Sequence, residues 1–288
     1  MDKLLVQLGV NIDFSFVLLF GGLIWVRILS MISVLPFLFA NPTPKTVRVG
    51  VSMAFTVFVY PLLAPKVPPA VVYNLLDIMA LFLKEVLFGM AIGFSAGLFF
   101  YGFQSAGSLI DGQRGTALAR VLIPALGEQS AVSGNFLYLF SVVLYLALGG
   151  HHLFFNAFFS SFQVLPVLDF PPMNWTTMPL MEFFASMTAE VLLIGIQISV
   201  PVMIAIFLID VILGVANRFA PQINVWELGF NLRGYVGILL LFLALTMIAG
   251  QVEHYGNRSV AQVEKVIQLF NPPPPAAPLP EISPEPTN

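Results

Sequence analysis

Long apolar runs separated by short polar breaks extend along almost the whole chain. A run of about 20 apolar residues is long enough to cross a bilayer as a helix. In chain order, such runs cover Phe14–Ala40, Val47–Pro65, Ile78–Phe103, Gly134–Gly149, Phe183–Val215 and Gly234–Gly250. A further apolar segment, Leu153–Leu168, is shorter and fits a re-entrant hairpin, an interfacial helix or another span. The pattern predicts an all-α, polytopic integral membrane protein with about six hydrophobic helices and about five to seven spans.

The breaks between these runs are compact and contain proline. They read NPTPK at 41–45, APKVPP at 64–69 and DFPPMN at 169–174. Since no break is long enough to separate two domains, residues 1–270 are predicted to form a single helical membrane domain. From Asn271 the sequence NPPPPAAPLPEISPEPTN cannot form a core, so residues 271–288 are predicted to be a disordered, proline-rich tail.

Composition agrees with this class and excludes several others. Hydrophobic residues make up 58% of the chain and charged residues 9%, and the formal net charge is −3. The few cations are scattered, so nucleic acid is not an expected partner. The absence of cysteine excludes thiolate metal sites and cysteine nucleophiles.

Motifs of enzyme chemistry are missing as well. His151 and His152 are adjacent and diverge on any one element, and no second pair of ligands at metal-binding spacing accompanies them. The sequence contains no Walker A loop and no GxGxxG motif that opens a helix. The chain is therefore predicted to be no enzyme and to hold no metal and no cofactor.

Arg27, Lys84, Glu85, Glu190 and Asp210 are ionisable residues that lie within apolar runs. An unpaired charge at the bilayer centre costs about 2.5 to 3.5 kcal/mol on insertion scales, so these side chains are predicted to face protein or water. Adjacent residues point in different directions on a helix, which argues against a Lys84–Glu85 pair and for partners on other helices, of this chain or of another. The alternative for Arg27 and Lys84 is that they reach a nearby interface.

Small residues recur on the third run, where Gly89, Gly93 and Gly97 are spaced by four. In lipid, a stripe of small residues lets two helix backbones approach closely, so these glycines are predicted to form a packing face. The alternative is that glycine is simply common in membrane helices.

The most unusual stretch is IDGQRGTALARVLIPALGEQ, at 110–129, which interrupts the apolar sequence with charges. Gly107, Gly112, Gly115, Pro124 and Gly127 discourage a continuous helix from Ser105 to Ser130. The stretch is polar at its ends and apolar in its middle, and irregular backbone at membrane depth is tolerated only inside protein or along an aqueous cavity. These features fit a plug across a pore, and they also fit a cytoplasmic surface loop with an interfacial helix.

Three segments together resemble a known family. They are QSAGSLIDGQRGTALARVLIP followed by GEQSAVSGNFLYLF (104–140), GGHH (149–152) and RFAPQINVWELGFNLRGYVG (218–237). The chain resembles, over about residues 10–255, the FliR/SctT family, the export-gate proteins of bacterial flagella and type III secretion injectisomes. The first motif is closer to the injectisome branch and APQINVWELGF to the flagellar branch. Ile123 departs from the acidic residue usual before the plug proline, and Arg120 stands where small residues are common.

The resemblance implies an inner-membrane, multi-pass subunit of a type III protein export apparatus. Its partners would be FliP/SctR-like, FliQ/SctS-like and FlhB/SctU-like subunits, together forming a gated pore for exported unfolded proteins in the lipid bilayer. A stand-alone transporter of small solutes or ions, with Glu190 and Asp210 as coupling sites, is the alternative. The plug implied by the matching motif comprises Asp111, Gly112, Gln113, Arg114, Gly115, Leu118, Arg120, Val121, Leu122, Ile123, Pro124, Leu126, Gly127, Glu128 and Gln129. A cytoplasmic turn comprises Arg218, Ala220, Pro221, Gln222 and Asn224.

Overall fold

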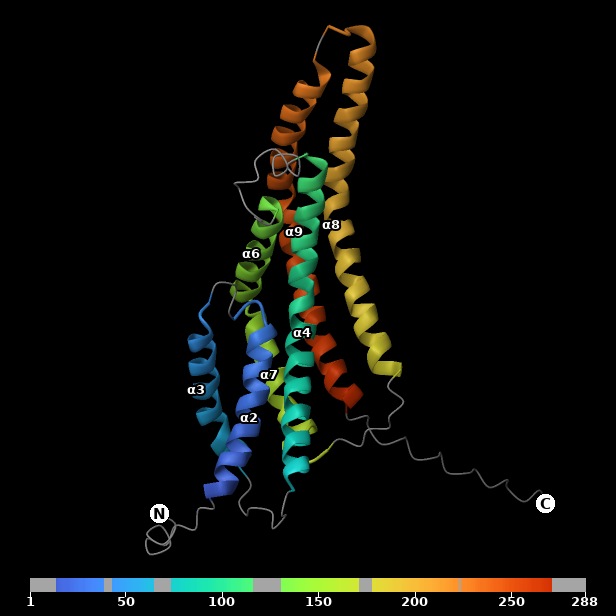
Figure 1. Cartoon of the computed structure of the whole chain (residues 1–288). Coiled ribbons are helices and arrows are strands. Elements are labelled where there is room, and N and C mark those ends of the chain that lie inside the picture. Colours follow the sequence, from blue (N-terminus) through green and yellow to red (C-terminus); the bar gives the residue numbers. More distant parts are fainter. Residues whose placement is uncertain are drawn as a thin grey trace, which may run out of the picture.

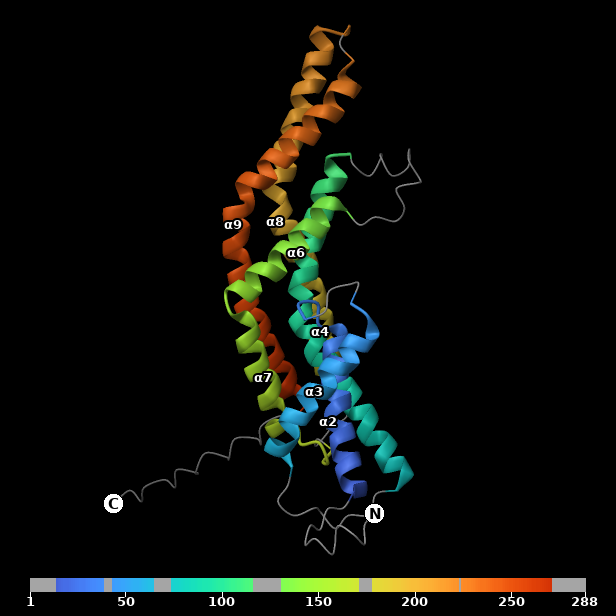
Figure 2. The same cartoon turned by 90° about the vertical axis from the view of Figure 1, so that its left-hand side faces the viewer.

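The computed structural model describes residues 14–38, 43–64, 74–115, 131–170, 178–222 and 224–270. Within these ranges the chain forms α2 (Phe14–Val34), α3 (Lys45–Leu63), α4 (Leu75–Gln113), α6 (Val132–Ala147), α7 (Gly150–Val164), α8 (Met178–Phe219) and α9 (Val225–Phe270). The helices form an elongated bundle, and α8 and α9 make a hairpin that projects beyond the others at one end (Figure 1, Figure 2). The described residues contain no strand, which confirms the all-α prediction.

The central helix is α4, which packs against α2, α6, α8 and α9. It begins at a capping box, in which the Asn74 N–H donates to Asp77 Oδ2 at 3.1 Å. It ends at Gln113, and Gly115, two residues beyond, has a φ of 78°, a left-handed conformation that L-residues disfavour.

The prediction that glycines interrupt the helix from Ser105 onward was wrong for its first part. The helix continues through Gly107 and Gly112 to Gln113. Glycine costs a helix about 1 kcal/mol relative to alanine, and burial of neighbouring side chains such as Ala106 and Ile110 against other helices outweighs that cost.

Four of the described helices, α2, α3, α8 and α9, are long and apolar enough to span a membrane. The α6–α7 pair adds a fifth if it counts as one span. This supports a polytopic membrane protein, and a count of five lies within the predicted five to seven spans. The helix α4, which contains the predicted span Ile78–Phe103, is not among these candidates, and many of its residues are buried among its neighbours.

The predicted span Gly134–Gly149 and the ambiguous segment Leu153–Leu168 correspond to α6 and α7. The two helices meet at a bend of 76°, with Gly149 at φ 77° between them. Tyr145 OH donates to Gly150 O at 2.8 Å, which fixes the bend. The GGHH sequence therefore contains the end of the turn, at Gly149, and the start of α7, in a bent helix pair that is either a broken span or a re-entrant loop.

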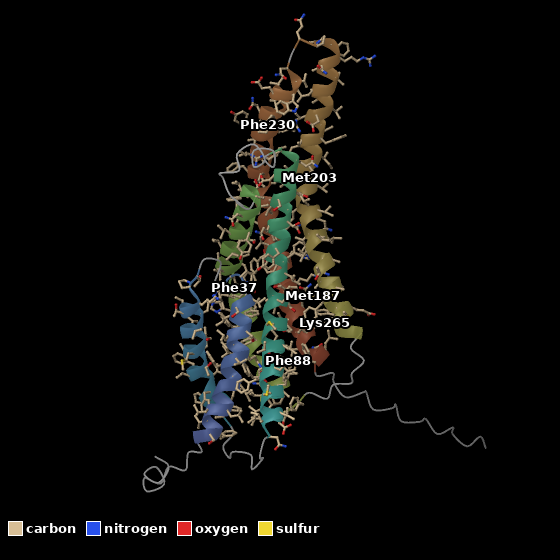
Figure 3. All side chains as sticks on the ribbon, viewed as in Figure 1. Phe37, Phe88, Met187, Met203, Phe230 and Lys265 are labelled. Carbon is tan, nitrogen blue, oxygen red and sulfur yellow. The ribbon has the colours of Figure 1, made fainter. Side chains whose placement is uncertain are left out.

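Aromatic side chains fill much of the interior. Phe37, which follows α2, lies 5.2 Å from the ring of Tyr145 and 5.4 Å from that of Phe154, between ring centroids. Met187 of α8 is buried at a similar height of the bundle, and Phe88 of α4 is buried lower in the view (Figure 3). Phe100 of α4 packs against the same rings, 6.1 Å from Phe37 and 5.4 Å from Tyr145 between ring centroids, so this aromatic cluster ties the central helix to its neighbours.

Candidate functional site

The predicted plug starts in the last turn of α4. Asp111, Gly112 and Gln113 end that helix, and Arg114 and Gly115 follow it in a turn. The remaining predicted plug residues, Leu118, Arg120, Val121, Leu122, Ile123, Pro124, Leu126, Gly127, Glu128 and Gln129, lie outside the described residues. The structure thus describes the two residues that flank positions 116–130, Gly115 and Ala131.

A buried polar cluster joins these two points, and we call Asp111, Arg114 and Ser133 the neck. Asp111 Oδ2 accepts a hydrogen bond from Ser133 N at 2.8 Å, and Asp111 Oδ1 accepts one from Ser133 Oγ at 2.6 Å. Arg114 Nη1 donates to Asp111 Oδ1 and to Ser133 Oγ, both at 3.1 Å. All three residues are buried.

In this arrangement Asp111 supplies a cap to a helix other than its own. The N-cap residue of α6 is Ala131, which has no side-chain oxygen with which to accept a hydrogen bond. The Asp111 carboxylate accepts the N–H of Ser133 in the first turn of α6 instead, and its negative charge faces the positive end of the α6 dipole.

Backbone packing at the neck is very close. A Cβ on Gly107 would lie 2.3 Å from Ser133 O, and one on Gly134 would lie 2.7 Å from Ser108 Oγ. A Cβ on Gly237 of α9 would lie 2.6 Å from Arg114 Cδ. The neck therefore brings together the end of α4, the start of α6 and one turn of α9.

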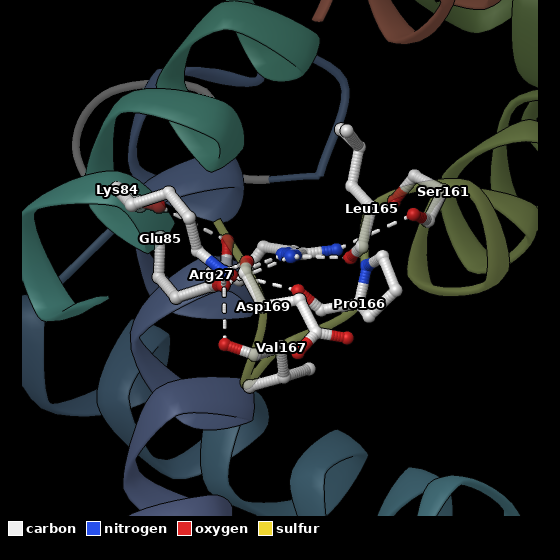
Figure 4. A network of polar contacts seen from close by, with 9 residues as sticks. Arg27, Lys84, Glu85, Ser161, Leu165, Pro166, Val167 and Asp169 are labelled. Carbon is white, nitrogen blue, oxygen red and sulfur yellow. Dashed lines mark hydrogen bonds and ion pairs between the residues drawn. The ribbon is translucent and has the colours of Figure 1, made fainter. Parts of the chain in front are cut away.

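A second buried cluster lies between α2, α4 and the end of α7 (Figure 4). Arg27 Nε pairs with Glu85 Oε2, and Arg27 Nη2 donates to Glu85 Oε1 and to Leu165 O, both at 2.9 Å. Arg27 Nη1 donates to Ser161 O at 3.5 Å. Arg27 is fully buried, which excludes the alternative that it reaches an interface.

Lys84 belongs to the same cluster, so the prediction that it does not pair with its neighbour was wrong. Lys84 Nζ lies 2.9 Å from Glu85 Oε1 and donates to Pro166 O at 3.0 Å and to Val167 O and Asp169 O at 2.8 Å. Long side chains compensate for the different directions of adjacent helical positions. Arg27 thus covers carbonyls at the end of α7, where a cation stabilises a helix dipole, and Lys84 covers carbonyls of the segment that follows α7.

Two of the acidic residues of α8, Glu190 and Asp210, pair with arginines of α9. Glu190 Oε1 lies 3.0 Å from Arg258 Nη1, and Glu190 Oε2 accepts from Gln262 Nε2 at 2.7 Å. Asp210 Oδ1 lies 3.3 Å from Arg233 Nε. The five predicted intramembrane ionisable residues therefore each have a partner within the chain.

The glycines Gly89, Gly93 and Gly97 lie against α2 and the residues after it. A Cβ on Gly89 would lie 2.3 Å from Arg27 O, and one on Gly93 would lie 2.7 Å from Met31 O. A Cβ on Gly97 would lie 2.9 Å from Pro36 Cδ. At all three positions the neighbouring segment lies so close that a side chain larger than that of glycine would collide with it.

The predicted cytoplasmic turn connects α8 to α9 at the tip of the projecting hairpin (Figure 1). Arg218 lies in the last turn of α8, and Ala220, Pro221 and Gln222 follow it. Asn224 precedes α9 and caps it, since its Oδ1 accepts from Glu227 N at 3.4 Å. The residues beside the turn are apolar and exposed, with Phe219 at 83% and Trp226 at 70%.

Within the described part of the chain, no group of three or more His, Asp or Glu residues is placed to hold a metal ion. His151 and His152 lie at the start of α7, with ring centroids 4.0 Å apart. The clusters above consist of paired charges and backbone carbonyls, an arrangement that fixes helices to one another.

Sequence reasoning missed four residues that complete these clusters: Ser133, Arg233, Arg258 and Gln262. Arg233 directly precedes the apolar run Gly234–Gly250, and Arg258 follows that run farther along the chain. Their charge was the signal that could have paired them with the acids of α8. Ser133 is an ordinary serine after a loop, and nothing in its local sequence indicates that it faces Asp111.

Comparison with known proteins identifies the family. A family model described as bacterial export proteins, family 1, matches residues 18–258. The chain belongs to this family. The match contains the whole neck, both helices of the hairpin tip and the charged cluster around Glu85, and it confirms the FliR/SctT resemblance.

Relatives from two secretion contexts are similar to this member of the family. The flagellar biosynthetic protein FliR of Bacillus subtilis is 28% identical over 247 residues, which are 86% of this chain and 94% of that protein. The Yop proteins translocation protein T of Yersinia pestis is 31% identical over 199 residues, 68% of this chain and 74% of that protein. The surface presentation of antigens protein SpaR of Shigella flexneri is 29% identical over 168 residues, 58% of this chain and 63% of that protein.

Proposed function

We propose that this chain is a multi-pass inner-membrane subunit of a type III protein export apparatus, in which the segment between α4 and α6 plugs the pore for exported unfolded proteins. The family match over residues 18–258, with relatives named for flagellar biosynthesis and for Yop protein translocation, carries the proposal. The neck supports the plug, because it holds both ends of that segment at one place in the bundle. The role of the chain is structural, without a chemical step.

The length of the exposed apolar face on α8 supports an assembly with other subunits. Large apolar residues are exposed from Met181 to Phe219, a distance of about 57 Å at a rise of about 1.5 Å per residue. The hydrocarbon core of a bilayer is about 30 Å thick, so lipid can cover only part of this face. Protein must cover the rest, and FliP/SctR-like, FliQ/SctS-like and FlhB/SctU-like subunits are the proposed partners.

Deleting residues 116–127 tests the plug, because this deletion leaves α4, the neck and α6 in the chain. We expect the assembled complex, reconstituted in liposomes, to become permeable to small ions while partner subunits still co-purify. The same complex with the full chain is the control. Unchanged conductance of the deletion complex, with assembly intact, would defeat the plug assignment.

The arginine partners of Glu190 and Asp210 argue against the stand-alone transporter. A coupling carboxylate must bind and release its ion, whereas both acids are already paired with cations of α9. We expect Glu190→Gln and Asp210→Asn to change assembly or stability only. Loss of solute uptake by the isolated chain in either variant would restore the transporter.

A further inference from the structure

Residues 150–164 of α7 and residues 251–270 of α9 lie side by side along one side of the bundle (Figure 2). Tyr145 marks the start of both segments. Its hydroxyl donates to Gly150 O at 2.8 Å, and a Cβ on Gly256 would lie 3.0 Å from its Cδ2. The two segments therefore share one stretch of the long axis of the bundle.

The same stretch also contains parts of α2 and α3, which are both long and apolar enough to span a membrane. Arg27 of α2 donates to Leu165 O, directly after α7, at 2.9 Å. The rings of Phe55 of α3 and Phe155 of α7 are 5.8 Å apart between centroids. At this depth α3 exposes large apolar side chains such as Met53, so one side of the molecule is suited to lipid there.

The exposed side chains of α7 and of residues 251–270, in contrast, are polar. Apart from Leu153, the exposed residues of α7 are His152, Asn156, Ser160 and Gln163. The exposed residues of 251–270 are Glu253, His254, Asn257, Arg258, Ala261, Glu264, Lys265 and Gln268. Each set recurs at spacings of three or four residues, which places it on one side of its helix. We call these two sets together the polar face.

The composition of the polar face indicates what covers it. It carries the acids Glu253 and Glu264 and the bases Arg258 and Lys265, and charges at bilayer depth face protein or a water-filled cavity, not lipid. Interface cores between proteins are rich in aromatic residues and Met and poor in Lys and Glu. The exposed side of α8 has such an interface composition, whereas the polar face lacks it. Water is therefore the covering that suits the polar face.

We propose that the polar face lines the water-filled conduit for exported proteins, while α3 faces lipid and α8 faces other subunits. This inference rests on the proposed function and assigns one wall of its conduit to described residues. The wall suits an unfolded polypeptide, because it offers hydrogen bonds to a solvated backbone. It also exposes little large apolar surface that would retain the apolar side chains of a passing chain.

The first test measures water access at single cysteines, since the chain itself contains no cysteine. Asn156→Cys and Asn257→Cys each introduce one thiol on the polar face, and Met53→Cys is the control on the exposed apolar side of α3. Each variant is assembled with cysteine-free partner subunits in liposomes, with a charged, membrane-impermeant maleimide on both sides of the membrane. We expect labelling of the polar face at least about tenfold faster than labelling of the control, because a thiol in apolar surroundings rarely ionises.

The second test determines whether this water belongs to the conduit. An exported protein of the same apparatus is fused to a domain that stays folded, so that it is arrested in transit. A series of single cysteines is placed along its unfolded part. Under oxidation we expect disulfides from this protein to Asn156→Cys and to Asn257→Cys. We expect none to Glu182→Cys, an exposed position on α8 outside the polar face.

The outcomes separate this inference from the proposed function. Labelling that is fast in the isolated chain but slow in the complex would mean that a subunit covers the polar face, which overturns the inference. Fast labelling without disulfides would place the polar face in water outside the conduit and also overturn it, whether or not deletion of 116–127 makes the complex leak. If the deletion complex is tight but the disulfides form, the plug fails and the conduit wall stands. Should an asparagine variant fail to assemble, Ser160→Cys, which exchanges one oxygen for sulfur, takes its place in both tests.

Discussion

At the residue scale, the balance of charge around Glu85 carries the first prediction. Glu85 is the carboxylate that the described residues place against both Arg27 and Lys84, and all three side chains are buried. Glu85→Ala leaves two cations without a counter-charge. Removing one partner of a buried ion pair costs about 3 to 5 kcal/mol, so we expect a large fall in the thermal unfolding temperature of the purified protein in detergent.

The control for this prediction is Glu182→Ala, at an exposed position on α8. Removal of an exposed carboxylate changes stability by less than about 1 kcal/mol. Equal unfolding temperatures for the two variants would show that the cluster contributes nothing to the fold.

The sequence predicted that Arg27 and Glu85 need partners, because isolated charges in apolar runs are costly. It could not predict which partners they find. Many of the hydrogen-bond acceptors in this cluster are backbone carbonyls at and after the end of α7. Every residue type has a backbone carbonyl, so the sequence does not indicate which carbonyls accept these hydrogen bonds. The contacts of the neck could not be predicted for the same reason, because Asp111 accepts a hydrogen bond from the backbone N–H of a residue 22 positions away.

At the element scale, the contact between α2 and α4 depends on the absence of a side chain at Gly93. A Cβ there would lie 2.7 Å from Met31 O, which is backbone and cannot move aside alone. We expect Gly93→Ala to destabilise the protein by about 1 to 3 kcal/mol, the usual cost of overpacking. Thermal unfolding of the purified chain measures this effect.

Gly250→Ala is a matched control, for which we expect no loss of stability. Gly250 is inside α9, and a Cβ there would meet nothing within 4 Å. Alanine is the better helix former by about 1 kcal/mol, so Gly250→Ala should leave stability unchanged or raise it. If both alanine variants shift the unfolding temperature in the same direction and by the same amount, close approach at Gly93 is not the cause.

The apolar pattern located each described helix but set several of its limits too short. The predicted spans Ile78–Phe103, Phe183–Val215 and Gly234–Gly250 are the apolar parts of α4, α8 and α9, which end at Gln113, Phe219 and Phe270. A helix continues through polar residues wherever capping and packing support it, whereas hydropathy registers only the part that suits lipid. The spacing of the glycines was a better guide, since it depends on helix geometry alone.

At the scale of the whole molecule, helix length separates surfaces that lipid can cover from surfaces that need protein. The 19 residues of α3 span about 28 Å, which fits within a bilayer core of about 30 Å. The α8–α9 hairpin is much longer and projects beyond the other helices (Figure 2). Phe219 and Trp226 at its tip are exposed, as is Leu62 of α3 at 82%.

Substitutions at the hairpin tip and on α3 should therefore differ in their effect on co-purification of partner subunits, although the substituted residues are similarly exposed. Buried aromatic anchors contribute about 2 kcal/mol or more to protein interfaces, so Phe219→Ser with Trp226→Ser should reduce co-purification of partner subunits at least about tenfold. Leu62→Ser should leave co-purification unchanged, because lipid contact carries no partner specificity. Neither change should lower the unfolding temperature of the isolated chain much, since these side chains pack against little of it. Full recovery of partners with the hairpin variant would mean that subunits cover α8 elsewhere along its length, because lipid alone is too thin to do so.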